Sequence, residues 1–105
     1  MNDSVFVKTN TLLFCDNSRN NQLRIRLSTS TGTNLANQNI TVEINEETFN
    51  IITNSEGIGI LNYTFLPNTE YNVTYSYQGN NEYYPSNGQT SFNINNINYY
   101  LQISL

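Results

Sequence analysis

Apolar and polar residues alternate with a period of two along several runs of this chain. The clearest runs carry their apolar residues at Leu23, Ile25 and Leu27, at Ile40, Val42 and Ile44, and at Tyr71, Val73, Tyr75 and Tyr77. Successive side chains of a β-strand point to opposite faces, so each run is expected to be a strand with one buried and one solvated face. No segment carries the i, i+3, i+4, i+7 apolar stripe of an amphipathic helix. The alternation therefore predicts an all-β chain.

Turn residues separate these runs. Gly32, Gly57 and Gly79 tolerate positive φ, and Pro67 removes a backbone donor from the sheet. Between these breaks we expect strands over residues 4–11, 22–29, 39–45, 47–54, 58–65, 71–78 and 89–95. Short strands with regularly spaced turn signals predict an immunoglobulin-like β-sandwich of about seven antiparallel strands in two sheets.

The length of 105 residues fits a single domain. We assign residues 1–95 to the sandwich module. Residues 99–105 again have the pattern of a strand, and they follow an Asn-rich stretch. We interpret residues 96–105 as a linker and a candidate first strand of a following repeat.

Charged side chains are scarce and mostly acidic. Four basic residues stand against eight acidic ones, which gives a net charge of −4. A nucleic-acid-binding face needs clustered Lys and Arg, whereas Arg24 and Arg26 are the one close pair in the sequence. The shortage of basic residues excludes nucleic acid as a partner. It also argues against binding to anionic membrane surfaces. No apolar span predicts direct membrane insertion.

The sequence lacks the residues that most catalytic and metal sites need. It has no histidine and a single cysteine, Cys15, so a Cys–His nucleophile, a zinc site and an internal disulfide are all excluded. Asp16, Glu56 and Glu82 are isolated carboxylates, whereas a calcium site needs several together. We expect no catalytic residue, metal or cofactor, and we do not predict an enzyme. We interpret Cys15 as a buried free thiol beside Phe14.

Two stretches of the chain, residues 27–42 and 54–86, carry a longer motif. The second ends on Tyr71, Val73, Tyr75, Tyr77, Gly79, Asn80, Tyr83 and Ser86. This motif resembles the Ig-like repeats of prokaryotic surface proteins, especially the adhesin-like proteins of methanogenic archaea, and the resemblance covers residues 20–95. It implies an extracellular, cell-surface location and neighbouring repeats of the same chain as partners.

Several residues of the motif have structural roles that their chemistry predicts. Tyr71 has the spacing of a tyrosine corner, whose hydroxyl bonds back to the preceding connection. Gly57 and Gly79 suit positions with unusual φ, and Gly59 is expected to let its strand approach the opposite sheet. Tyr83 is expected to fold its loop back onto the edge of the sandwich.

Two kinds of surface residue are candidate sites. Tyr83 and Tyr84 lie in a loop rich in Asn and Ser, a composition typical of adaptable binding loops. The competing interpretation is that Tyr83 anchors the loop and Tyr84 is simply half exposed. Among the N-x-S/T sequons, which begin at Asn2, Asn39, Asn62 and Asn72, the last three are candidate glycosylation sites of an exported module.

Three functions fit these features. The first is a non-catalytic structural spacer, or stalk, within a cell-surface adhesin-like protein. The second is a module that binds a cell-surface glycan or protein through the loop around Tyr83 and Tyr84. The third is an accessory domain of a surface hydrolase. None of the three functions requires catalysis, which agrees with the absence of an acid–base pair from the sequence.

Overall fold

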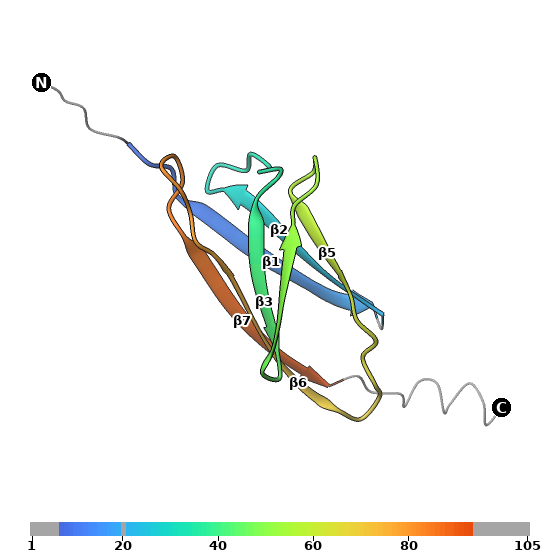
Figure 1. The fold of residues 1–105 in the computed structure, drawn as a ribbon. Coiled ribbons are helices and arrows are strands. Elements are labelled where there is room, and N and C mark those ends of the chain that lie inside the picture. Colours follow the sequence, from blue (N-terminus) through green and yellow to red (C-terminus); the bar gives the residue numbers. More distant parts are fainter. Residues whose placement is uncertain (1–6, 20, 94–105) are drawn as a thin grey trace, which may run out of the picture.

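The computed structural model describes residues 7–19 and 21–93, which form two packed β-sheets (Figure 1). The strands are β1 (Thr11–Arg19), β2 (Gln22–Thr29), β3 (Asn39–Ile44), β4 (Glu47–Ile52), β5 (Ile58–Asn62), β6 (Glu70–Tyr77) and β7 (Ser86–Asn93). One sheet has the order β1-β2-β5 and the other β4-β3-β6-β7, and neighbouring strands pair antiparallel. The predicted all-β sandwich is confirmed.

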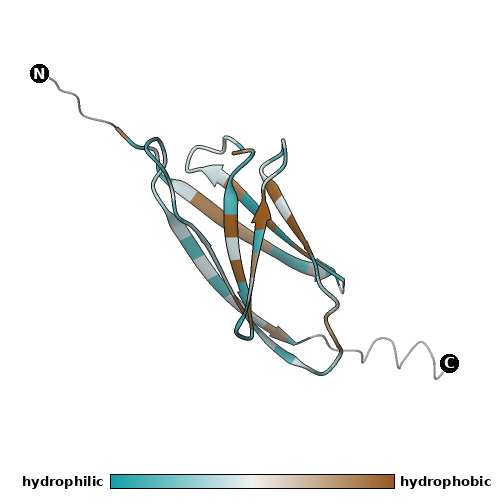
Figure 2. Ribbon diagram, in the orientation of Figure 1, coloured by the Kyte–Doolittle hydropathy of each residue, from teal (hydrophilic) through white to brown (hydrophobic). Residues whose placement is uncertain are grey.

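The core lies between the inward faces of the two sheets. Hydrophobic and hydrophilic residues alternate in bands along β3 (Figure 2). The apolar side chains that are fully buried are Leu23, Ile25, Leu27, Ile40, Val42, Ile44 and Val73. Each contributes about 1.5–3 kcal/mol of transfer free energy. The alternation read in the sequence therefore corresponds to the inside and outside of the sandwich.

Aromatic rings fill one end of this core. The ring of Phe65 lies 4.9 Å from that of Tyr71 and 5.2 Å from that of Phe92, in edge-on arrangements. The ring of Tyr63 lies 4.8 Å from that of Phe65 in a tilted arrangement and meets Phe49 edge-on at 5.8 Å. Phe49, Tyr71 and Phe92 come from the four-stranded sheet, and Tyr63 and Phe65 come from the connection after β5, so the rings pack this connection onto that sheet.

The two sheets approach closely where β5 passes β4. A Cβ atom on Gly59 would lie 2.8 Å from Cδ1 of Ile51, closer than side chains pack. The absence of a side chain at Gly59 therefore gives Ile51 room to fill the space between the sheets.

The first strand was predicted in the wrong place. Residues 7–10 lie outside the strands, residues 4–6 lie outside the described part of the chain, and β1 covers Thr11–Arg19 instead. Leu12, Leu13, Phe14 and Cys15 form a continuous apolar run, which hides the period of two. The run is continuous because both faces of β1 carry apolar side chains: Leu13 and Cys15 pack against the core, while Leu12 and Phe14 are exposed.

The second, third, fourth and sixth strands agree with the prediction to within two residues at each end, and the fifth and seventh differ by more. The fifth strand was expected to reach residue 65 but β5 ends at Asn62. The seventh was expected over residues 89–95 but β7 begins at Ser86, and residues 94 and 95 lie outside the described part. Its early start follows from pairing, because Ser86 is aligned with Tyr77 and Asn93 with Glu70 along all of β6. The sequence of a polar edge strand gives little sign of where such pairing begins.

The expected linker and strand at residues 96–105 also lie outside the described part.

Candidate functional site

The loop that carries Tyr83 and Tyr84 is tied to the start of the chain. The Thr9 N–H donates to the Glu82 carbonyl at 2.9 Å, and the Tyr84 N–H donates to the Thr9 carbonyl at 2.9 Å. Thr9 and Tyr83 thereby form a parallel bridge. The Thr11 hydroxyl adds a bond of 2.9 Å to the Tyr84 carbonyl. The backbone of this loop is held by the segment that leads into β1.

The two tyrosines of this loop have different surroundings. Tyr83 is half-buried and packs against the core. Tyr84 is 45% exposed, and the ammonium Nζ of Lys8 lies 5.6 Å from its ring centroid, within the range of a cation–π contact. The side chain available to a ligand is therefore that of Tyr84, with a cation on its face.

The conformation of the loop depends on Gly79. Its φ is +78°, and a Cβ atom there would lie 2.6 Å from the Tyr83 carbonyl oxygen. The Asn80 side-chain oxygen accepts bonds from the N–H groups of Glu82 at 2.7 Å and Tyr83 at 3.0 Å. A short turn folded on itself in this way places Tyr83 over the sandwich edge.

Tyr71 makes a contact of the tyrosine-corner type. Its ring is buried, and its hydroxyl oxygen accepts a hydrogen bond of 2.8 Å from the Leu66 N–H. The bond fixes the connection between β5 and β6 to the start of β6. Tyr71 thus has the structural role that the sequence predicted for it.

The three sequon asparagines that the structure describes are exposed. Asn39 begins β3 and Asn62 ends β5. Asn72 lies on the outer face of β6, where its side-chain oxygen accepts a bond of 2.7 Å from the Ser91 hydroxyl. Each is placed where a sugar would extend into solvent.

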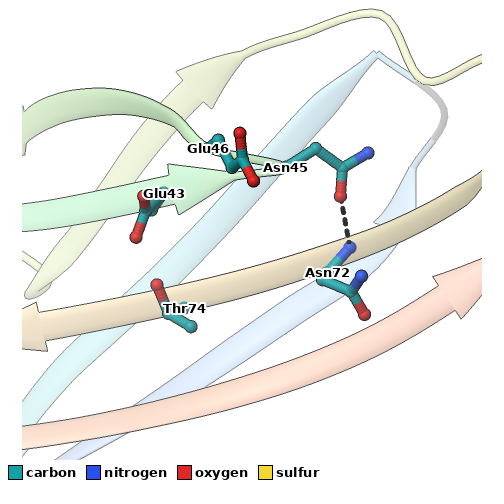
Figure 3. Close-up of a pocket in the computed structure, with 5 residues that line it drawn as sticks. All are labelled: Glu43, Asn45, Glu46, Asn72 and Thr74. Atoms are coloured by element: carbon teal, nitrogen blue, oxygen red, sulfur yellow. Dashed lines mark hydrogen bonds between the residues drawn. The ribbon is translucent and has the colours of Figure 1, made fainter.

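Asn72 also borders a depression of about 400 Å³ on the outer face of the four-stranded sheet (Figure 3). The other lining residues are Glu43, Asn45, Glu46 and Thr74. The Asn45 side-chain oxygen accepts a bond of 2.8 Å from the Asn72 N–H, drawn as a dashed line in Figure 3. Two carboxylates are fewer than a strong calcium site uses, and within residues 7–19 and 21–93 no group of three or more His, Cys, Asp or Glu side chains comes together.

Cys15 is a free thiol that packs against the core, but it is half-buried and not fully buried as predicted. Its sequence neighbour Phe14 is 66% exposed. Burial raises the pKa of the Cys15 thiol to about 11, and the neighbouring Asp16 carboxylate adds to the rise. The thiol is therefore protonated at neutral pH and is a poor nucleophile.

Sequence reasoning missed one surface, the outer face of the three-stranded sheet. We call it the arginine face and define it by Leu12, Phe14, Arg24, Arg26, Ile58 and Ile60. Arg26 is aligned with Phe14 on one side and Ile58 on the other, and Ile60 stands opposite Arg24. The spacing of Arg24 and Arg26 was visible in the sequence, but its apolar neighbours come from strands that only the fold brings together.

Within the described part of the chain, no helix is long and apolar enough to cross a membrane. Comparisons with protein-family models, with curated proteins and with solved structures gave no match.

Proposed function

We propose that the chain is a non-catalytic, extracellular module of a cell-surface adhesin-like protein and that it acts as a structural spacer. The observation that carries the proposal is the path of the chain. β1 and β7 begin at the same end of the sandwich and run in the same direction, so the described part of the chain starts at one end and its last strand finishes at the other (Figure 1). A protein that enters at one end and leaves at the other is suited to join neighbouring modules in a line.

This path also decides how the module responds to tension. Pulling on the two ends displaces β1 along the strand direction against the segment before β7. The two backbone bonds between Thr9 and residues 82–84 lie across that displacement, so both bear load together. The Thr11 hydroxyl, bonded to the Tyr84 carbonyl and lying 2.8 Å from the Ser86 hydroxyl, supports the same junction.

The outer face of the four-stranded sheet supports an extracellular setting. Its side chains are mainly amides and hydroxyls: Asn39, Thr41, Glu43, Thr48, Asn50, Asn72, Thr74, Ser76, Asn87, Gln89, Ser91 and Asn93. They bond to one another across strands, as the Thr41 hydroxyl does to the Asn50 side-chain oxygen at 3.1 Å. Such a face is well solvated without a high net charge.

A second candidate function is contact with a glycan or protein through the loop around Tyr83 and Tyr84. The exposed ring of Tyr84 favours it. Because Tyr83 packs against the core, this contact would rest on Tyr84 and its neighbour Lys8. Titration of cell-wall glycans against a Tyr84→Ala variant and the wild type distinguishes it from the spacer function, which needs no such contact.

Single-molecule pulling of the full chain, held by its two ends, tests the spacer function. We expect one cooperative rupture, and we expect Thr11→Ala to lower the rupture force because it removes the hydroxyl at the loaded junction. Thr41→Ala is the matched control, since it removes one hydroxyl bond on the outer face away from the junction. Gradual extension of the wild-type chain without a rupture would contradict the proposal, as would equal effects of the two variants.

A further inference from the structure

The arginine face combines positive charge with exposed apolar side chains. Leu12 is 56% and Ile60 is 40% exposed, beside the still more exposed Phe14. Arg24 and Arg26 lie on the central strand β2 and, with Phe14, Asp16 and Ile58, line a depression of about 240 Å³. Asp16 is aligned with Arg24 on the neighbouring strand, so the face carries two guanidinium groups and one carboxylate. This single face holds two of the four basic residues of a chain whose net charge is −4.

The geometry points to a docking surface for an acidic, amphipathic protein segment on this face. Such a segment presents carboxylates toward Arg24 and Arg26 and apolar side chains toward Phe14 and Ile60. A guanidinium binds a carboxylate through two parallel N–H donors, and Arg and aromatic residues are enriched among the residues that dominate binding energy at interfaces. The proposal does not depend on the spacer function, because it concerns a lateral face and not the two ends.

Arg26 is already oriented for this role. Its Nε and Nη2 atoms donate to the Asn34 side-chain oxygen at 3.2 and 2.8 Å. The acceptor is a neutral amide, so the contact orients the guanidinium without neutralising it. A guanidinium has five N–H donors, so others are left for a partner. A side chain held in place before binding loses less conformational entropy when a partner arrives.

Charge complementarity selects a separate partner over the chain itself. The face carries two guanidinium groups and one carboxylate, that of Asp16, so its charge is positive overall and two copies that met through it would repel each other. The carboxylates of Glu43 and Glu46 on the other sheet are lined by Asn and Thr and offer no apolar flanks. Residues 94–105 contain no acidic residue in sequence and cannot supply the carboxylates.

Selection from a random dodecapeptide display library against the immobilised full chain tests the proposal. We expect the selected peptides to be enriched in Asp and Glu together with apolar residues. A selected peptide should bind about tenfold or more weakly to an Arg24→Glu/Arg26→Glu variant, since each lost ion pair is replaced by a repulsion. Leu12→Ser/Phe14→Ser should weaken binding as well, and added salt should weaken binding to the wild type.

The sequence supplies a matched control for charge. An Arg19→Glu variant changes the net charge by the same amount as Arg26→Glu alone, and Arg19 lies outside the face. These two single variants are compared as a matched pair. Arg24→Gln/Arg26→Gln serves in place of the double Glu variant if thermal unfolding shows that variant to be destabilised. Peptides without acidic enrichment, equal binding to both charge variants, or failure to select any peptide would each overturn the proposal.

Discussion

At Tyr71, a single hydroxyl on a buried ring holds the connection between β5 and β6 in place. Its oxygen accepts the Leu66 N–H at 2.8 Å, whereas the Tyr63 hydroxyl makes only a long, exposed contact of 3.4 Å with Glu47. Both tyrosines belong to the same aromatic group, with ring centroids 6.1 Å apart. They therefore form a natural pair for measuring what a well-made bond contributes.

We expect Tyr71→Phe to lower the free energy of unfolding by about 1 kcal/mol, because it removes one good hydrogen bond and leaves the packing of the ring unchanged. Tyr63→Phe should change it by less than about 0.5 kcal/mol, since its contact is long and open to solvent. Urea denaturation of both variants measures the difference. Equal losses of unfolding free energy in the two variants would mean that the Tyr71 hydroxyl bond contributes no more to stability than the Tyr63 contact does.

The ionisation of the Cys15 thiol makes the stability of the protein depend on pH in the alkaline range. Its pKa in the folded protein is about 11, above the ordinary value of 9.0, because burial favours the neutral thiol. The contribution of this thiol to the free energy of unfolding is therefore complete below pH 9.0, and it is lost as the pH rises toward about 11. Burial also raises the pKa values of Tyr75 and Tyr77, which act in the same direction.

The contribution of the thiol is isolated by comparing the wild type with Cys15→Ala. We expect the free energy of unfolding of the wild type to fall more steeply across this pH range than that of the variant, which lacks the thiol. Urea midpoints measured at a series of pH values provide the comparison. Parallel curves for the two proteins would mean that the thiol is not protected from ionisation by the fold.

Among the elements, the turn between β4 and β5 packs against β2, the neighbour of β5 in the three-stranded sheet. The Leu27 N–H of β2 donates to the Gly57 carbonyl at 2.8 Å, and a Cβ atom on Gly57 would lie 2.7 Å from the Leu27 carbonyl oxygen. Gly57 also has φ of +78°. The turn at Gly32 has positive φ too, but no atom lies within 4 Å of a Cβ atom built there.

Alanine variants at these two turns distinguish the cost of an unfavourable φ from the cost of a steric clash. Gly57→Ala should destabilise the protein by about 2–5 kcal/mol, because it combines an unfavourable φ with a clash against backbone. Gly32→Ala should cost about 1–3 kcal/mol for φ alone. Thermal unfolding of both variants tests this, and a Gly57→Ala loss no larger than that of Gly32→Ala would contradict the close approach.

The sequence predicted the central strands better than the edges. Leu23, Val42 and Val73 are buried as the alternation indicated, because β2, β3 and β6 have one inward and one solvated face. The first strand broke this rule, since Leu12 and Phe14 make its outer side apolar as well. Period alone cannot locate a strand whose two faces are alike.

The surface features of the protein could also be predicted only in part from the sequence. Tyr83 and Tyr84 are sequence neighbours, and their different exposure follows from the return of their loop against Thr9, a contact across most of the chain. The arginine face combines β1, β2 and β5, and its pairing of Phe14 with Arg26 and of Arg26 with Ile58 depends on register. Residue types can be read locally, but which strands become neighbours depends on long-range packing.

For the whole molecule, the proposed setting predicts where the chain is found. Antibodies raised against the folded chain should label intact native cells, because the spacer function places the module outside the envelope. A cytoplasmic protein of the same cells, stained in parallel, is the control for intactness. Labelling that appears only after the cells are permeabilised would contradict the extracellular location and leave the fold unaffected.

The shared direction of β1 and β7 determines how much length the proposed spacer module would add to a longer chain (Figure 1). A strand as long as β1 spans about 30 Å, so a folded module adds about that much to the length of its parent chain. The same residues drawn out fully would span on the order of 290 Å. Losing one module under load would thus lengthen the tether roughly tenfold at that point and relieve the tension on its neighbours before they give way.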